Sequence, residues 1–332
     1  MTIITFPLDE ARPTHPHLRR FNVRTDLRAV ADLVERCFDE TLDADGRRYI
    51  RNMRQTADSP QFFRWASGMS DRSGGAFNGF VWEHEGAIVG NLSLIPMPAR
   101  GEKIFLIANV AVDTDHRRRG IARSLTEAAL EEGRTRRADR LWLHVREDNP
   151  AAIRLYESVG FAEHTRRTTW TNTGRASEPA DAPGIRIVDL SRRHWARTLD
   201  WLNHLHPPDL DWYLTLDVRA LQPGPLGRIY RLLRGSTYRT QAAVRGDQPL
   251  AVLAWQGTRA ASDRFWLAAP RDPEPEAVRL LISHVEQELT TPKPLNLEYP
   301  AGLAAGALES SGFTPHHTLI WMQRGNSRSA SG

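Results

Sequence analysis

The stretch that decides the fold of this chain is Asn109–Arg123, which reads NVAVDTDHRRRGIAR. Its apolar start predicts a buried strand over Ile104–Val112. The strand runs into a basic turn, and the turn opens an amphipathic helix over residues 121–137. A helix N-terminus presents unpaired N–H groups and positive dipole character, and Gly120 and Ala122 let its backbone approach a ligand closely. The segment therefore predicts a cradle for a diphosphate.

The cradle differs from the two common phosphate-binding motifs. No Gly-Lys-Ser/Thr follows it, which excludes a P-loop, and the dinucleotide pattern Gly-x-Gly-x-x-Gly is missing. The surrounding periodicity predicts further elements. These are helices over Asp26–Phe38, capped by Thr25, over Arg47–Gln55 and over Asn149–Ser158, and strands over Ala76–Glu83, Ala87–Pro96, Leu141–Val145 and Phe161–Trp170. The alternation predicts a mixed α/β fold.

These residues resemble the GNAT family (Gcn5-related N-acetyltransferases). Arg117–Ala122 match its signature (Arg/Gln)-x-x-Gly-x-(Gly/Ala), and Asn149–Phe161, NPAAIRLYESVGF, match its downstream pattern. The resemblance covers about residues 76–170 well and 22–75 loosely. It implies a mixed sheet that is splayed open between the strand ending at Val112 and the strand Leu141–Val145, with acetyl-CoA lying in the opening as the co-substrate.

The resemblance also implies roles for particular residues. Tyr156 occupies the family's general-acid position, where a phenol can protonate the departing thiolate. In relatives that acetylate protein N-termini a glutamate stands where this chain has His144, so His144 is either the base or a polar residue at a strand edge; a water chain is the alternative base. No metal is implied. The implied coenzyme A contacts are Val110, Ala111, Val112, Arg117, Arg118, Arg119, Gly120, Ile121, Ala122, Arg123 and Asn149.

The two halves of the chain read as copies. Glu157–Phe161, ESVGF, recurs as Glu309–Phe313, ESSGF, with the same order of elements around it. In the second copy, residues 269–276 hold three prolines and three carboxylates in place of the cradle, and Leu308 replaces Tyr156. We expect two tandem GNAT acyl-CoA N-acyltransferase folds, the first active and the second degenerate. The expected division is an N-terminal arm 1–20, a GNAT domain 21–171 with the acetyl-CoA site, a linker 172–184, a degenerate GNAT-like domain 185–325 and a disordered tail 326–332.

Composition narrows the class of protein. The 332 residues carry 44 basic and 40 acidic side chains, spread along the chain, which argues against a nucleic-acid partner. No apolar run approaches the roughly 18 residues that span a bilayer, so no membrane partner is expected. The N-terminus lacks the pattern of a signal peptide, and Cys37, the single cysteine, excludes an internal disulfide and reads as a small core residue. These features favour a cytoplasmic protein, either a monomer or a homodimer.

The sequence therefore favours an N-acetyltransferase that moves an acetyl group from acetyl-CoA to a primary amine by direct attack in a ternary complex. The acceptor is a small-molecule or peptide amine. A non-catalytic acyl-CoA-binding sensor or regulatory protein is the alternative. The acidic stretch Asp39–Asp45 either attracts a cationic amine or is a solvated surface loop.

Overall fold

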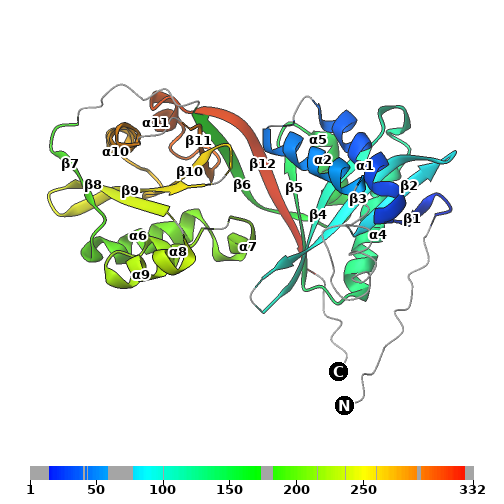
Figure 1. Cartoon of the computed structure of the whole chain (residues 1–332), viewed down its shortest axis with the longest axis horizontal. Coiled ribbons are helices and arrows are strands. Elements are labelled where there is room, and N and C mark those ends of the chain that lie inside the picture. Colours follow the sequence, from blue (N-terminus) through cyan, green and yellow to red (C-terminus); the bar gives the residue numbers. More distant parts are fainter. Residues whose placement is uncertain are drawn as a thin grey trace, which may run out of the picture. The chain divides into compact units, whose positions relative to one another are not determined.

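The structure, a computed structural model, describes residues 15–39, 42, 44–58, 78–99, 101–172, 182–214, 216–235, 237–258, 260–289 and 293–325. The chain forms two compact units (Figure 1). Unit 1 comprises residues 1–145, 149–164 and 321–332, and unit 2 comprises 146–148 and 165–320. Each unit contains parallel and antiparallel strand pairs together with helices, so the predicted mixed α/β fold class is confirmed.

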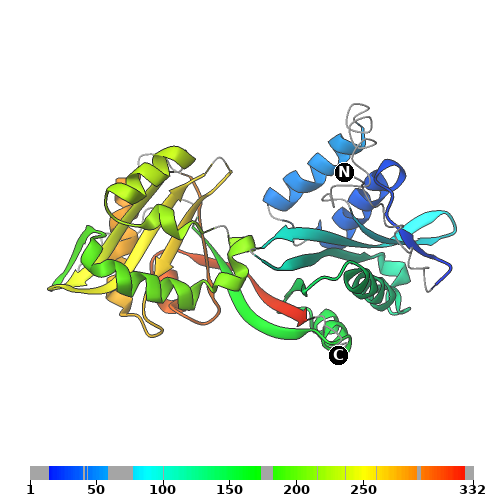
Figure 2. The ribbon, with the colours of Figure 1, turned by 90° about the horizontal axis from the view of Figure 1, so that it is seen from below.

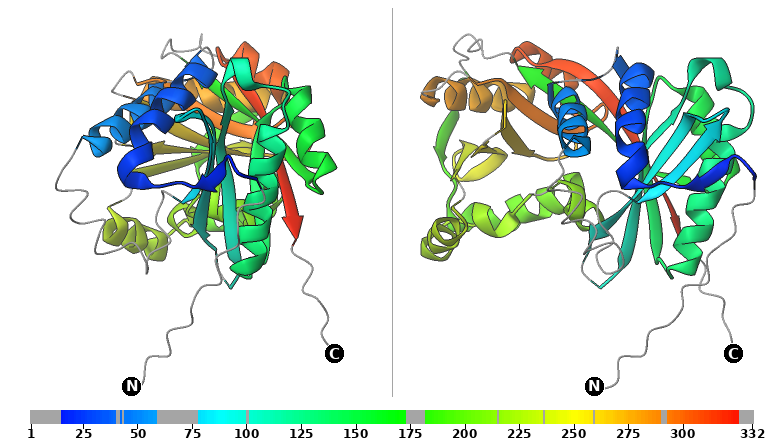
Figure 3. Two further views of the ribbon diagram at one scale, coloured as in Figure 1. Left: turned by 90° about the vertical axis from the view of Figure 1, so that its right-hand side faces the viewer. Right: turned by 45° about the vertical axis from the view of Figure 1, so that its right-hand side comes forward.

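Unit 1 is built on a sheet with the strand order β1-β2-β3-β4-β5-β12. Helices α1 and α4 pack on opposite faces of this sheet (Figures 2 and 3). The elements are β1 (Leu18–Arg20), α1 (Val23–Phe38), α2 (Ala44–Ala57), β2 (Gly79–His84), β3 (Ala87–Pro98), β4 (Lys103–Val112), the 3-10 turn η2 (Thr114–His116), α4 (Ile121–Thr135), β5 (Arg140–Arg146), α5 (Pro150–Ser158), the start of β6 (Ala162–Asn172) and the end of β12 (Thr314–Gly325).

Helix α1 begins three residues earlier than the sequence predicted. Asn22 is the N-cap, and its side chain accepts a hydrogen bond from the Arg24 N–H at 3.0 Å. Thr25 lies inside the first turn, where its hydroxyl donates to Asp26 Oδ1 at 2.8 Å, so the prediction of Thr25 as the cap is wrong. The Asp26 carboxylate accepts a hydrogen bond from the Asn22 N–H at 2.7 Å. Backbone N–H groups at a helix start have no partner within the helix, so this bond stabilises the start at Asn22.

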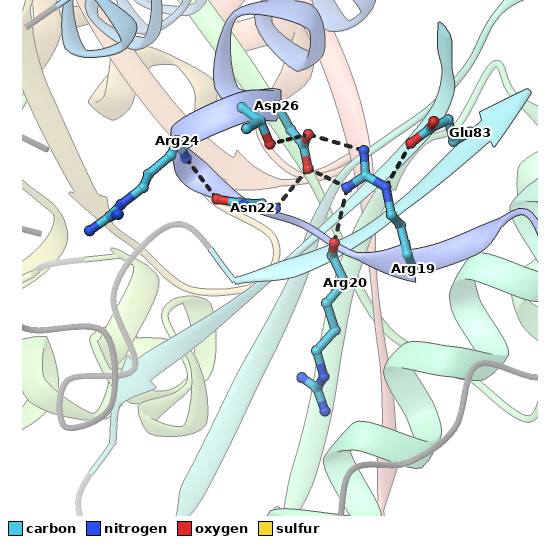
Figure 4. A network of polar contacts seen from close by, with 7 residues as sticks. Arg19, Arg20, Asn22, Arg24, Asp26 and Glu83 are labelled. Carbon is cyan, nitrogen blue, oxygen red and sulfur yellow. Dashed lines mark hydrogen bonds and ion pairs between the residues drawn. The ribbon is translucent and has the colours of Figure 1, made fainter. Parts of the chain in front are cut away.

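Arg19 of β1 ties this strand to Asp26 of α1 and to Glu83 of β2 (Figure 4). Arg19 donates from Nη1 to Asp26 Oδ2 at 2.6 Å and from Nε to Glu83 Oε2 at 2.7 Å. Asp26 is buried, and this burial opposes its ionisation. The hydrogen bonds from Arg19, Asn22 and Thr25 nevertheless hold the pKa of Asp26 below its ordinary value. A lowered pKa means that the ion pair stabilises the fold above about pH 4 and that this stabilisation is lost as pH falls further.

We expect Asp26→Asn to lower the free energy of unfolding by about 2–4 kcal/mol near neutral pH, because it leaves Arg19 without its buried partner. Urea denaturation of the full chain measures this loss. The difference from the wild type should shrink as pH falls below about 4 and through the lowered pKa of Asp26, because the stabilisation by the carboxylate is lost over that range. Glu83→Gln is the matched control, since Glu83 bonds the same guanidinium from a half-exposed position and its loss should cost less than about 1 kcal/mol. Equal losses in the two variants would contradict this account.

Unit 2 is built on a sheet with the order β12-β6-β11-β10-β9-β8-β7. Its core lies between this sheet and helix α10 and includes Phe265, Leu267, Leu281 and Leu297. The elements are most of β6, β7 (Ile185–Asp189), α6 (Arg192–Leu205), the 3-10 turn η3 (Pro208–Leu210), α7 (Asp211–Leu214), α8 (Val218–Leu221), α9 (Pro225–Arg234), β8 (Thr237–Arg245), β9 (Gln248–Gly257), β10 (Asp263–Ala268), α10 (Pro275–Glu288), β11 (Leu295–Pro300), α11 (Ala305–Ser310) and the start of β12.

The compact units differ from the sequence ranges 21–171 and 185–325 because two strand ends are exchanged. Strand β6 belongs to unit 2 from Thr165 onward, and β12 belongs to unit 1 from Trp321 onward. Trp170 accordingly pairs with Leu297 of β11 in unit 2, and the Trp321 ring lies 4.9 Å from the His144 ring in unit 1. Each half of the sequence thus completes the sheet of the other unit.

The ends of the predicted domains also differ from expectation. Leu18–Arg20, expected as part of an arm, form β1 and pair with Phe80–Trp82 of β2. A pattern of three residues is too short to reveal such a strand by its periodicity. Residues 1–14, most of the predicted linker 172–184 and the predicted tail 326–332 lie outside the described residues. No described helix is long and apolar enough to cross a membrane.

Candidate active site

A cavity of about 590 Å³ lies in unit 1 where β4, the N-terminus of α4 and helix α5 meet. Every residue that the sequence predicted for the site lines this cavity except Arg119 and His144. The predicted residues that line it are Val110, Ala111, Val112, Arg117, Arg118, Gly120, Ile121, Ala122, Arg123, Asn149 and Tyr156. Two segments separated by 25 residues of helix and strand are therefore brought to one place.

Strands β4 and β5 pair over only part of their lengths. Parallel pairing runs from Ile104 with Arg140 to Ile107 with Leu143, although β4 continues to Val112 and β5 to Arg146. Beyond the last pair, Val110, Ala111 and Val112 of β4 line the cavity. This separation agrees with the splayed sheet that the family resemblance implied.

A β-bulge in β4 shapes the same wall. The register with β3 shifts between Asn91 and Ser93, and Asn109 takes a positive φ of 52°. The buried Asn91 amide donates to the Asn109 carbonyl at 2.9 Å, and the Asn109 amide donates to the Ser93 hydroxyl at 3.3 Å. A bulge bends its strand and turns the following backbone groups in a new direction. Asn91 therefore holds the bend from which Val110 enters the cavity, a role that no local sequence signal announced.

The turn between β4 and α4 has the geometry of an anion cradle. Arg118 and Gly120 have φ values of 64° and 80°, and Gly120 is the N-cap of α4 without a capping side chain. The first N–H groups of α4 therefore open toward the cavity with the positive end of the helix dipole. Arg117 donates from Nε to the Val112 carbonyl at 3.2 Å, which fixes the start of the turn.

Arg119 and Arg123 lie differently from each other. Arg119 donates to the Asp115 carbonyl at 3.0 Å, so it braces the turn from outside the cavity lining. Arg123 lines the cavity and donates to the Ser158 hydroxyl at 2.7 Å. The resemblance implied that Arg117, Arg118 and Arg119 all contact coenzyme A, but a tight turn directs successive side chains to different sides, and Arg119 does not line the cavity.

Helix α5 supplies the opposite wall. Asn149 is its N-cap and accepts the Ala152 N–H at 3.1 Å, with Pro150 in the first turn. Tyr156, about two turns further, is buried beside the Phe161 ring, with centroids 6.2 Å apart. Burial raises the pKa of Tyr156 to about 12. The phenol is therefore neutral near neutral pH and keeps a proton to donate.

His144 lies on β5 but outside the cavity lining. Its side chain is exposed, and its ring contacts the Trp321 ring of β12 at 4.9 Å. It follows Leu143, the last β5 residue paired with β4, so it stands where the two strands begin to separate. Its role as a base stays a prediction.

Cys37 and Phe38, at the end of α1, also line the cavity. Cys37 packs against the core of α1, as expected, but its Sγ also lies 3.4 Å from the Val112 carbonyl. Burial raises the pKa of the Cys37 thiol, which disfavours the nucleophilic thiolate. Seventy residues of sequence separate this helix end from the cradle, so no local pattern could have placed it there.

Among the described residues, no group of three or more His, Cys, Asp and Glu side chains is arranged to hold a metal ion. Most of the acidic stretch Asp39–Asp45 lies outside the described residues or has no described side chain. The site that remains is an anion cradle, a strand backbone and a neutral buried phenol around one cavity.

Residues 28–161 match the model of the acetyltransferase (GNAT) family. This stretch of the chain is similar to the GNAT family in sequence. The matched range contains β2–β5 and the whole cavity lining, so the family assignment and the cavity concern the same part of the chain.

Curated relatives of this GNAT segment are named as acetyltransferases. The [ribosomal protein bS18]-alanine N-acetyltransferase of Salmonella typhimurium is 49% identical over 72 residues, which are 22% of this chain and 49% of that protein. The mycothiol acetyltransferase of Thermobispora bispora is 39% identical over 95 residues, which are 28% of this chain and 30% of that protein. The chain thus spans about half or less of the length of these relatives.

The GNAT likeness in fold extends over nearly the whole chain. A GCN5-related N-acetyltransferase from Sphaerobacter thermophilus has a TM-score of 0.54 at 12% identity, covering 94% of this chain and 96% of that one. At this identity the comparison shows the fold alone. Both units therefore share a GNAT-type arrangement, as the repeat in the sequence predicted.

In unit 2, β10 and β11 also pair over only part of their lengths, and buried side chains contact both strands beyond the last pair. Pairing of β10 with β11 ends at Phe265 and Leu297. Beyond that pair, His206 lies 3.4 Å from the Leu267 carbonyl, and the buried Arg167 bonds the Glu298 carboxylate at 2.7 Å. Burial, together with Arg167, lowers the pKa of His206 to about 3, so this ring is neutral. The N-cap of helix α10 is Glu274, whose carboxylate repels an anion, and its first residue is Pro275, which has no N–H group to donate to one.

Proposed function

We propose that unit 1 transfers an acetyl group from acetyl-CoA to a primary amine by direct attack within a ternary complex. The observation that carries this proposal is the cavity that is lined by Val110–Val112 of β4, by the N-terminus of α4 and by the neutral phenol of Tyr156. The named activities of the relatives support acetyl transfer, and they include both a protein and a small-molecule acceptor.

Each part of the cavity would serve one step. The N–H groups at the start of α4, with Arg117, Arg118 and Arg123, would hold the diphosphate. An N–H group of Val110–Val112 would stabilise the negative charge that develops on the thioester oxygen as the amine nitrogen attacks the carbonyl carbon. When the carbon–sulfur bond breaks, Tyr156 would give its proton to the thiolate and recover one from solvent. The attacking amine must lose a proton, for which His144 is the candidate base.

The direct test is a titration with acetyl-CoA followed by a screen of amines for release of free thiol. Saturable binding with turnover on at least one amine is the expected result. Binding without turnover across a broad panel of peptide and small-molecule amines would instead support the non-catalytic acyl-CoA sensor.

The role of His144 is tested by His144→Gln. If the imidazole removes the proton, the variant should lose about 100-fold in kcat near neutral pH and lose the acid limb of its pH–rate profile, which lies between about pH 5 and 8 for an imidazole. Steady-state rates over that range measure both effects. His84→Gln is the control, since His84 is another unit 1 histidine outside the cavity lining. A His144→Gln profile identical in shape to the wild type would assign proton removal to water.

A further inference from the structure

Helix α9 of unit 2 displays its apolar side chains to solvent. Leu226, Ile229, Leu232 and Leu233 are 69%, 55%, 82% and 80% exposed. Among the residues that the structure describes, the fifth exposed large hydrophobic side chain is Tyr49, at 41%. Aliphatic side chains concentrated on one short helix form a patch, in contrast to the single exposed residues that ordinary surfaces carry.

The helix is held to unit 2 by its small and polar side. Gly227 is buried, and a Cβ added there would lie 1.9 Å from the Gln222 carbonyl oxygen, so no larger residue fits against that segment. Arg231 donates from Nη1 to the Ala220 carbonyl at 2.6 Å. An amphipathic helix normally turns its apolar face to the core, and α9 is mounted the other way round.

The charges of α9 lie at the borders of this apolar face. With 100° per residue, Leu226, Ile229, Tyr230, Leu232 and Leu233 span an arc of about 160°. Arg228 lies at one edge of the arc and Arg234 at the other, and Arg234 stacks over the Tyr230 ring at 5.7 Å. The ten residues of the helix contain three arginines and no acidic residue. Long basic side chains at both edges of an apolar stripe are suited to reach up to anionic headgroups while the stripe enters the acyl boundary.

The apolar face of α9 could be covered by a second copy of the chain or by a lipid surface, and its size and charge favour the lipid surface. A stable dimer needs about 800 Å² of buried surface from each copy, far more than four aliphatic side chains on ten residues provide. Pairing α9 with α9 of a second copy would also bring its arginines together without an acidic partner on either helix. A lipid surface needs only that the aliphatic side chains enter it and that its charge be negative.

We propose that α9 binds the surface of an anionic lipid bilayer, with its leucine and isoleucine side chains in the acyl boundary and Arg228 and Arg234 among the headgroups. The helix lies on the membrane and does not cross it. This adds a membrane partner that the sequence analysis did not expect, because the absence of a spanning segment excludes only a crossing. The proposal is independent of the catalytic site.

The test is co-sedimentation of the full chain with vesicles of phosphatidylcholine alone or of equal parts phosphatidylcholine and phosphatidylglycerol. We expect binding to the anionic vesicles that weakens as salt is raised. Leu232→Gln/Leu233→Gln should lower the vesicle partition coefficient at least about tenfold, since two aliphatic side chains no longer enter the bilayer. Arg228→Gln/Arg234→Gln should lower it by about fivefold for each charge removed.

Because these four side chains are exposed, the variants should fold normally, which calorimetry checks. Arg271→Gln/Arg279→Gln is the charge-matched control, with two exposed arginines of unit 2 away from α9, and it should bind vesicles nearly as the wild type does. Equal binding to neutral and anionic vesicles, or unchanged binding by the leucine variant, would overturn the proposal. The proposal would also be overturned if the wild type does not bind vesicles but forms a dimer in sedimentation velocity, and the leucine variant abolishes that dimer.

Discussion

Gly120→Glu is expected to raise the dissociation constant for acetyl-CoA at least about 100-fold while unit 1 stays folded. Gly120 lines the cavity at the N-cap of α4, and a Cβ added there meets nothing within 4 Å. A glutamate side chain therefore extends into open space where the diphosphate is proposed to rest. Its carboxylate would take over the helix N–H groups and repel the phosphates, and the loss of several charge-assisted bonds exceeds about 3 kcal/mol. Isothermal titration calorimetry measures the constant.

The backbone strain of this change needs a control of its own. Gly120 has a φ of 80°, and a side chain in this region costs about 1–2 kcal/mol. Gly86, in the β2–β3 turn, has a φ of 77° and equally open surroundings, and it does not line the cavity. Gly86→Glu should show the same small fall in melting temperature with unchanged affinity. An affinity of Gly120→Glu equal to that of Gly86→Glu would mean that the diphosphate binds elsewhere.

Tyr156→Phe is expected to lower kcat about 100-fold and to leave the dissociation constant for acetyl-CoA within about threefold of the wild type. The ring stays in place beside Phe161, so the wall of the cavity is kept and only the proton donor is lost. Because burial raises the pKa of Tyr156 to about 12, the wild type should show no alkaline loss of activity from this group up to about pH 10. Single-turnover rates of thiol release measure the effect on chemistry.

Tyr213→Phe is the matched control for this change. Tyr213 is a half-buried phenol of unit 2 whose hydroxyl donates to Glu298 at 3.4 Å, and its partial burial raises its pKa as well. Removing that hydroxyl should lower stability slightly and leave kcat unchanged. A normal kcat in Tyr156→Phe would show that the departing thiolate takes its proton from solvent.

Much of the candidate site was predictable because its parts are local. The strand end, the turn and the start of α4 are contiguous, and a helix start exposes N–H groups wherever it occurs. The Asn149 cap and Tyr156 likewise lie on one short helix, so their spacing determined their common face. The misplaced residues depended on non-local geometry. Arg119 lies outside the cavity because the turn directs its side chain to the Asp115 carbonyl. Cys37 lines the cavity because the end of α1 packs against β4 near Val112.

The sequence by itself determined the α/β class, the repeat and the segment that forms the cradle, because periodicity, turn residues and helix starts act over a few neighbouring positions. Only the tertiary structure decided which unit the end of β6 and the end of β12 join, and which face of α9 is exposed to solvent. Any strand offers backbone N–H and C=O groups for pairing, and in a repeated fold the same strand can pair with either sheet. The connections and the side-chain packing therefore decide which sheet β6 and β12 join. A helix likewise carries its apolar stripe in its sequence, but the tight approach at Gly227 turned that stripe outward.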